Sequence, residues 1–326
     1  MRTKKISMNI VTPILVFVII TLVFTIATGG ELLKPNNLAN LLDQVIPVLV
    51  SGCGMVFVIA TGGVDMTAGG IMGFSAAVSA MVYAMMGGTA AAMGVMVLMI
   101  FAISIAVGFL NGFLVAVCKV NSFMTTLAMS IVLRGLMAYV INVYGTAMVQ
   151  PLRVLNLFPV KVLILVVAII VCVYLLQNHV FGRKCRAIGE NELAMLSSGV
   201  AVRKIKILAF VVSGVMAAVA ALLSMAKLGG STASLGSNFE LDVMFAMFVG
   251  GIAVTGGKSA RVVNFVIGAF TVIVMDISFV LIGWSSGEMK QLIEGLILLV
   301  LLFLSGKTKG KTLVFGKKKA AAAAAE

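Results

Sequence analysis

The chain has 326 residues, of which 61% are hydrophobic and 11% are charged, and its net charge is +13. Soluble domains carry about 25% charged residues, so this composition excludes an ordinary water-soluble fold. The lysines and arginines lie at the ends of apolar runs, so the positive charge indicates the cytoplasmic loops of a membrane protein and excludes a nucleic-acid partner.

Apolar runs of about 20 residues recur along the chain, and each is long enough to cross roughly 30 Å of hydrocarbon. They lack the alternation of β-barrel strands. The sequence therefore predicts an all-α polytopic membrane protein with about ten transmembrane helices. The third and eighth are rich in small residues and are candidates for broken or partly crossing helices. The predicted spans are 9–28, 45–62, 66–86, 92–117, 122–143, 160–177, 206–226, 240–257, 262–284 and 290–305.

The distribution of basic residues predicts the orientation of the chain. Most of the 24 lysines and arginines fall on one side of the membrane when the N-terminus is placed in the cytoplasm, so both termini are predicted to be cytoplasmic. The chain then divides into a cytoplasmic N-terminus (1–8), a transmembrane domain (9–305) and a basic cytoplasmic tail (306–326). The first apolar run is longer than that of a typical signal peptide, so it is expected to remain as a helix.

The stretch GGVDMTAGG, from Gly62 to Gly70, places a carboxylate between two pairs of glycines. The predicted topology puts Asp65 near the cytoplasmic end of the second span, where its side chain is well placed to accept backbone N–H bonds at the start of the third. A hinge role for Asp65 is favoured over contact with a substrate, and both stay open. Glycines four residues apart predict close helix packing. Such pairs are Gly69/Gly73, Gly108/Gly112 and Gly283/Gly287.

Few ionisable residues lie inside the predicted spans. Arg134 and Asp276 are central in theirs, and Glu294 is near the start of the last one. A charge at mid-bilayer costs about 3 kcal/mol on insertion scales, so it usually faces the bundle interior or a wet cavity. Two interpretations stay open: a polar translocation path, or a structural pair such as Arg134 with Asp276. Arg134 can also snorkel to the outer margin. The candidate path or hinge residues are Asp65, Thr67, Asn111, Thr125, Arg134 and Asp276.

The longest loop, 178–206, is predicted to be cytoplasmic. Its middle, GENELAMLSSGV, is predicted to form a short helix with Glu190 and Glu192 in the first turn and a stop at Gly199. From composition alone, a helix on the membrane surface and a docking helix for a soluble partner are about equally favoured. The acidic first turn argues mildly against binding to anionic lipid.

The segment GGIAVTGGKS, 250–259, looks like a phosphate-binding loop but lacks its spacing. The pattern G-x-x-x-x-G-K-[ST] needs a glycine where the chain has Ile252, and a soluble strand–helix context is missing. No nucleotide site is therefore expected, and the motor of an energised transporter would be another polypeptide. With one histidine and no C-x-x-C spacing, neither a metal nor an organic cofactor is expected.

Four segments, in the same order, resemble the permease subunits of bacterial ABC importers for monosaccharides, the ribose/xylose/galactose type of binding-protein-dependent permease. They are GGVDMTAGG, NSFMTTLAMSIVLRGL, FGRKCRAIGENELAMLSSGVAVRKIK and LGSNFELDVMFAMFVGGIAVTGGKSA, and the resemblance covers roughly residues 40–305. Asn121 and Ser122 replace the usual prolines. Asp276 stands where the family more often has asparagine, so no role is carried over to that position.

The resemblance implies a transport permease without its own ATPase site, in the bacterial plasma (inner) membrane. It implies three partners: a cytoplasmic ABC ATPase that binds ATP, an extracytoplasmic sugar-binding protein, and a second permease copy or close paralogue. It also implies that the 178–206 loop couples the permease to the ATPase. The substrate is expected to be a neutral monosaccharide. Two alternative functions stay open: a self-contained, ion-coupled secondary transporter using Asp65 and Asp276, or a non-transporting membrane scaffold. The matching coupling residues are Gly189, Glu190, Asn191, Glu192, Ala194 and Gly199.

Overall fold

The computed structural model describes residues 8–253, 256–284, 292–293, 295–297 and 299, and within them every regular element is helical. The only bridge between extended segments in these residues joins Met148 to Gly230. The elements are α1 (Met8–Ala27), η1 (Glu31–Leu33), α2 (Pro35–Ala60), α3 (Ala68–Met85), α4 (Ala90–Ala116), α5 (Ser122–Tyr144), η2 (Gln150–Asn156), α6 (Phe158–Gln177), α7 (Val180–Glu190), α8 (Glu192–Ser197), α9 (Val202–Leu228), α10 (Phe239–Val249), η3 (Gly257–Ser259) and α11 (Val262–Leu281).

Seven of these helices are long and apolar enough to cross a membrane: α2, α3, α4, α5, α6, α9 and α11. The helix α1 is apolar over Val11–Ala27. The predicted span at 240–257 forms a helix only over its first part, because α10 ends at Val249 after 11 residues. At 1.5 Å per residue such a helix is about 16 Å long, roughly half the hydrocarbon thickness.

The count of ten crossings and the cytoplasmic termini remain predictions. Most of the predicted span 290–305 lies outside the described residues, and so do Glu294 and the basic tail 306–326.

The helix α2 is the centre of the bundle. Every residue from Val45 to Ala60 is buried, and the helix packs against α6, α9 and α11. Its Pro47 lies inside the helix, which a membrane bundle tolerates because neighbouring helices satisfy the freed backbone groups. In contrast, α4, α5 and α6 expose most of their apolar side chains, as expected for surfaces that face lipid or another membrane protein.

Glycines allow α4 and α9 to pack closely. A Cβ atom on Gly108 would lie 2.6 Å from the carbonyl oxygen of Phe210, and one on Gly112 would lie 2.7 Å from the Cα of Ile207. The predicted packing role of this pair is therefore confirmed. Gly283 instead follows the end of α11 with a φ of +88°, and a Cβ there would meet no atom of the described residues within 4 Å. Gly287 lies outside the described residues.

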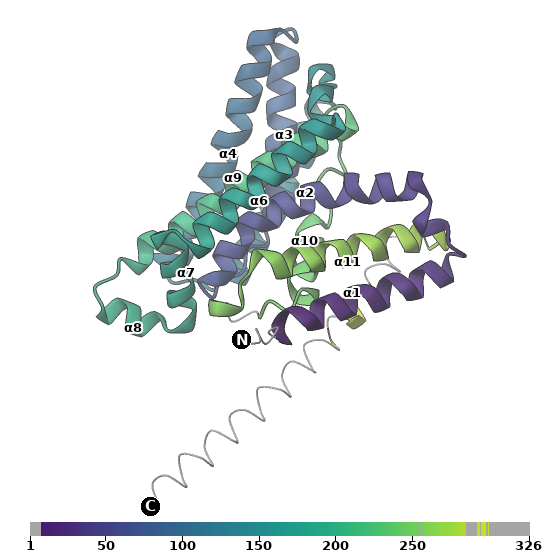
Figure 1. The fold of residues 1–326 in the computed structure, drawn as a ribbon. Helices are drawn as coiled ribbons and strands as arrows, with labels where there is room; N and C mark the ends of the chain where they lie inside the picture. The colour runs from purple at the N-terminus through teal and green to yellow at the C-terminus, as the bar shows by residue number, and fades with distance from the viewer. Residues whose placement is uncertain (1–7, 254–255, 285–291, 294, 298, 300–326) are drawn as a thin grey trace, which may run out of the picture.

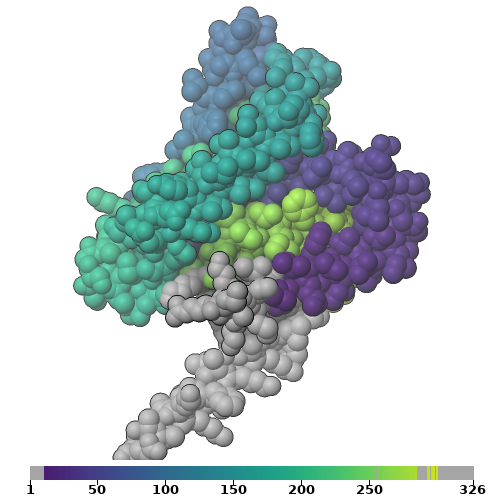
Figure 2. All heavy atoms as spheres, viewed as in Figure 1, coloured from purple at the N-terminus to yellow at the C-terminus, as the bar shows by residue number. Residues whose placement is uncertain are grey.

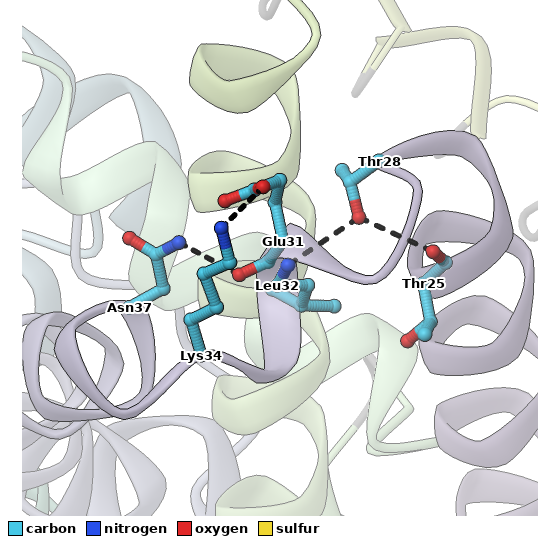
Figure 3. Close-up of polar contacts among 6 residues, drawn as sticks. All are labelled: Thr25, Thr28, Glu31, Leu32, Lys34 and Asn37. Carbon is cyan, nitrogen blue, oxygen red and sulfur yellow. Dashed lines mark hydrogen bonds and ion pairs between the residues drawn. The ribbon is translucent and has the colours of Figure 1, made fainter.

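A compact turn joins α1 to α2 (Figure 3). The Thr28 hydroxyl donates to the carbonyl of Thr25 and accepts the N–H of Leu32. Lys34 and Glu31 form an exposed ion pair of 2.5 Å. The Asn37 amide donates to the Glu31 carbonyl at 2.7 Å, so the turn also fixes the first residues of α2.

The bundle has two ends. Figure 1 shows α8 at lower left, away from the α1–α2 turn on the right and the α3–α4 turn at the top. Figure 2 shows the same separation in the space-filling view, where the teal and green residues that include α8 form the left edge of the molecule. We call the end of the bundle that carries α8 the α8 end. It includes the turn 61–67 and also the segment 256–261, which packs against α7 through Gly257. The opposite end includes residues 28–34 and 229–238.

Candidate functional site

The turn between α2 and α3 holds a buried polar network. Asp65 is 2% exposed, and Thr67 and Asn111 are fully buried. One carboxylate oxygen of Asp65 accepts the N–H of Thr67 at 3.0 Å and its hydroxyl at 2.5 Å. The side-chain amide of Asn111, on α4, donates to the Thr67 hydroxyl oxygen at 3.1 Å. Three of the six predicted path or hinge residues therefore lie together.

Asp65 fixes the start of α3, although it is not the N-cap residue. The N-cap position belongs to Thr67, whose side chain caps no backbone N–H. Asp65 satisfies the Thr67 N–H from two residues earlier, so it acts as the predicted acceptor at the helix start. Ser213, on α9, lies beside the Asp65 carboxylate. The network thus joins the α2–α3 turn to both α4 and α9.

The first turn of α5 holds the same segment through Val64. The Ser122 hydroxyl accepts the N–H of Val64 at 3.0 Å, and the Thr126 hydroxyl lies 3.4 Å from its carbonyl oxygen. The predicted Thr125 is not part of this contact, because its hydroxyl donates to the Asn121 carbonyl within α5. Sequence reasoning missed Ser122 and Thr126. The replacement of the family's usual proline by Ser122 could have pointed to this contact, because a serine hydroxyl can form a hydrogen bond with the backbone and a proline side chain cannot.

Arg134 pairs with Glu240. Its guanidinium lies 2.8 and 2.9 Å from the two carboxylate oxygens and donates to the Gly236 carbonyl at 3.0 Å. The Glu240 side chain is only 9% exposed. The suggested pair of Arg134 with Asp276 is therefore wrong. The partner is a carboxylate in the first turn of α10, where an acidic side chain also suits the helix dipole.

The glycines that follow Asp65 let α3 approach this ion pair. A Cβ on Gly69 would overlap the Glu240 carboxylate and the Gly236 carbonyl. A Cβ on Gly73 would overlap the sulfur of Met137 on α5. The close packing predicted for Gly69 and Gly73 is confirmed, and the contact is with an ion pair and a backbone turn as well as with a helix.

Asp276 is not part of the Asp65 network. It is half-buried near the C-terminal end of α11 and lines a cavity of about 370 Å³ together with residues of α2, α9 and α10. The six predicted path or hinge residues thus do not form one site. Asp65, Thr67 and Asn111 meet at the α8 end, Arg134 contacts Glu240, and Asp276 lines the cavity at the opposite end.

The predicted coupling segment forms two helices. Glu190 is the last residue of α7, so its predicted place in the first turn of the docking helix is wrong. Asn191 is the N-cap of α8 and accepts the Ala194 N–H at 3.0 Å. Glu192 is in the first turn and pairs with Lys206 at 2.6 Å. Gly199, with a φ of +74°, ends the helix as predicted.

The surface of α8 is open. None of its residues is buried, and Leu193 and Leu196 are 75% and 49% exposed. In contrast, the side chain of Cys185 on the neighbouring helix α7 is buried, and this burial raises the pKa of its thiol to about 12. The two leucines of α8 form a small apolar face that borders a cavity of about 500 Å³ between α8 and the ends of α2, α4 and α9, and this face suits a protein partner.

The last turn of α7 meets the end of α2 and the glycine-rich turn at 256–257. A Cβ on Gly189 would overlap the carbonyl of Ala60, at the end of α2. A Cβ on Gly256 would overlap the carbonyl of Ile59 there, and one on Gly257 would lie 2.5 Å from the Glu190 carboxylate. The GGKS segment, 256–259, is thus a packing turn. It holds α7 against the end of α2, next to the turn that carries Asp65.

These features define a multi-pass α-helical membrane protein with a short exposed helix at one end and buried polar networks inside. Residues 37–302 match the family model described as "Branched-chain amino acid transport system / permease component", and the chain belongs to this family. No solved structure matches the chain.

Relatives align along almost the whole chain. The ribose import permease protein RbsC of Escherichia coli (strain K12) is 29% identical over 94% of this chain and 96% of its own length. RbsC of Bacillus subtilis (strain 168) is 30% identical over 90% and 92%. The xylose transport system permease protein XylH of Haemophilus influenzae is 25% identical over 95% and 99%. The resemblance seen in the sequence is confirmed: the chain is a permease subunit of an ABC importer and a multi-pass protein of the bacterial inner (plasma) membrane.

Proposed function

We propose that the chain translocates a monosaccharide across the membrane. An extracytoplasmic binding protein delivers the sugar, and a separate cytoplasmic ABC ATPase drives its transport. The observation that carries this proposal is the alignment of ribose and xylose permeases with at least nine-tenths of the chain. The family description names branched-chain amino acids, whereas the names of both kinds of relative contain a pentose, ribose or xylose. A second permease copy, identical or closely related, completes the path.

The coupling element in this proposal is the segment 189–199. The ATPase docks on the leucines of α8. When the ATPase closes around bound ATP, it pulls α8 and α7 as one unit. Since Gly189 and Glu190 pack against the end of α2 and the turn at Gly257, the pull reaches the turn that carries Asp65. The hydrogen bonds of Asp65 with Thr67 then pass it to α3. ATP is bound by the partner, and the permease needs neither a metal nor an organic cofactor.

Reconstitution tests the function directly. The chain is co-expressed with an ABC ATPase and a sugar-binding protein from the same organism and placed in liposomes, with ribose, xylose, galactose and leucine offered as substrates. The expected result is uptake of one of the sugars that requires both ATP and the binding protein. Uptake by the permease alone, driven by a proton or sodium gradient, would contradict the proposal and favour the ion-coupled alternative.

Asp65 is expected to act as a structural hinge. Asp65→Asn keeps an oxygen that can accept the N–H and hydroxyl of Thr67, so folding and uptake should stay near wild type. Asp65→Leu leaves these buried donors without an acceptor, at about 1–3 kcal/mol for each, and should reduce the yield of folded protein. Size-exclusion chromatography and uptake assays measure both effects. A well-folded Asp65→Asn variant without transport would instead show that the charge itself is needed.

Cys118 provides a test of the proposed orientation. It is the exposed cysteine of the four, in the turn between α4 and α5. The others are buried, and since the pKa of Cys185 lies at about 12, almost none of that thiol is the reactive thiolate near neutral pH. A membrane-impermeant maleimide should therefore label Cys118 in inside-out vesicles and leave it unlabelled in intact cells.

The matched control moves the cysteine to the other end of the bundle. Lys34→Cys in a Cys118→Ser background places an exposed thiol in the α1–α2 turn (Figure 3). This variant should show the opposite pattern, with labelling in intact cells. Labelling of Cys118 from outside would reverse the proposed orientation.

A further inference from the structure

Asp65 is a buried carboxyl group without a positive partner. It is 2% exposed, and its hydrogen bonds come from the N–H and the hydroxyl of Thr67, with Ser213 beside it. No lysine, arginine or histidine in the described part of the chain forms an ion pair with it. Burial raises the pKa of the Asp65 carboxyl, and the bonds from Thr67 oppose this shift. An ionised carboxylate is so costly to bury without a counter-ion that such a group is expected to hold a proton instead.

The helices around Asp65 offer no counter-ion. Neither α3 nor α4, which pack side by side (Figure 1), has a charged side chain. The only one on α2 is Asp43, which pairs with Lys161. The only one on α5 is Arg134, which pairs with Glu240. The cations of α9 lie at its two ends and that of the α4–α5 turn is exposed, and none of them bonds to Asp65 in the described structure: Lys119, Arg203, Lys204, Lys206 and Lys227.

Asn111 offers an acceptor for this proton. The Thr67 hydroxyl gives its one hydrogen to Oδ1 of Asp65, so it must accept a hydrogen from Asn111, and the amide nitrogen of Asn111 faces it at 3.1 Å. The oxygen of the same amide, Oδ1 of Asn111, is buried and has no hydrogen-bond partner in the described structure. An ionised carboxylate only accepts hydrogen bonds, whereas a protonated carboxyl also donates one. A proton on the second oxygen of Asp65, Oδ2, therefore suits both groups, because a buried acceptor without a donor is destabilising.

We propose that Asp65 is a proton-binding site: in the folded permease at neutral pH its Oδ2 carries a proton and donates it to Oδ1 of Asn111. This bond ties the turn between α2 and α3 directly to α4, in addition to the chain of bonds through Thr67. Asp65 is then a hydrogen-bond donor as well as the acceptor at the start of α3. The assignment rests on the burial and the hydrogen bonds of this chain, and it does not depend on the proposed function.

Loss of the proton weakens the contact between the turn and α4. An ionised Asp65 and Oδ1 of Asn111 are both acceptors, so they repel each other when no hydrogen lies between them. The contact is therefore expected to loosen as the pH rises through the pKa of the folded site. Asp65→Asn is the matched variant, because its amide keeps an acceptor for Thr67 and a donor for Asn111 and has no proton to lose in this range.

Infrared spectroscopy of the purified full-length permease detects the proton directly, because a protonated carboxyl has a C=O stretching band above the amide region. The difference spectrum between wild type and Asp65→Asn at neutral pH should contain this band, and its absence would overturn the proposal. Asn111→Leu, or Asn111→Ala if leucine prevents folding, should shift the band to higher frequency, because the carboxyl loses its acceptor. Ser213→Ala is the control and should leave the band in place. A shift with Ser213→Ala and none at Asn111 would overturn the pairing with Asn111.

Thermal denaturation in detergent supplies a second measurement. The folded chain keeps a proton that the unfolded chain loses above about pH 4. The melting temperature of the wild type relative to Asp65→Asn should therefore fall as the pH rises from about 5 to 8, and it should level off only above the pKa of the folded site. The comparison cancels the titration of all other groups. A difference that stays constant over this range would mean that folded Asp65 is already ionised, against the proposal.

The proton site and the proposed function can fail separately. Sugar uptake by the wild-type complex, together with a difference spectrum that lacks the carboxyl band, would overturn the proton site and leave the function standing. The band and the pH-dependent melting difference, together with a complex that imports no sugar, would support the proton site and overturn the function.

Discussion

Replacing Leu193 and Leu196 together with aspartate is expected to abolish uptake while the permease stays folded in the membrane. Both side chains are largely exposed and no residue of α8 is buried, so the bundle loses almost no packing. The docking surface loses both of its apolar anchors, each worth about 2 kcal/mol or more if it acts as a hot spot. ATP-driven uptake and co-purification of the ATPase measure the effect, and both should be lost.

The matched control keeps the apolar surface. Leu193→Met with Leu196→Met retains a flexible hydrophobic face, so docking and uptake should persist. The aspartate variant also decides between the two interpretations of this helix that composition left open. If the ATPase still co-purifies with it, α8 does not dock there, and the helix that lies on the membrane surface becomes the better interpretation.

Arg134→Met is expected to destabilise the permease strongly. The Glu240 carboxylate is 9% exposed and faces Gly69 and the Gly236 carbonyl, so loss of the guanidinium leaves a buried charge without its counter-ion. Breaking a buried ion pair from one side costs about 3–5 kcal/mol. The melting temperature in detergent and the yield of monodisperse protein should both fall. The double variant Arg134→Met/Glu240→Gln should recover part of the loss, because no unpaired charge remains.

The exposed ion pair of the α1–α2 turn serves as a reference for Arg134. Lys34→Met removes the cation that pairs with Glu31, where both side chains are about half exposed or more, and exposed pairs contribute about 0–1 kcal/mol. Its melting temperature should therefore stay near wild type. An equal, small change for both variants would mean that the Arg134–Glu240 pair does not hold α5 to α10.

The positions of the long helices could be predicted from the sequence. The span predicted at 122–143 is α5, Ser122–Tyr144, and that predicted at 92–117 is α4, Ala90–Ala116. This works because hydrocarbon requires a continuous apolar helix of a fixed length, which is a local property of the chain. Prediction was poorer at 240–257, where α10 stops at Val249. Apolar composition continues beyond that point, but the backbone turns at Gly250 and Gly251.

Local sequence also determined the capping of α8 by Asn191 and its end at Gly199, because both depend on hydrogen bonds between near neighbours in the chain. The tertiary structure alone decided which charges meet. Arg134 and Glu240 are 106 residues apart, and nothing local distinguishes Glu240 from Asp276 as a partner. The pairing follows from how α3, α5 and α10 cross, which the glycines permit but do not specify. The same crossing places Asp65 beside Asn111 and leaves Asp276 in a separate cavity.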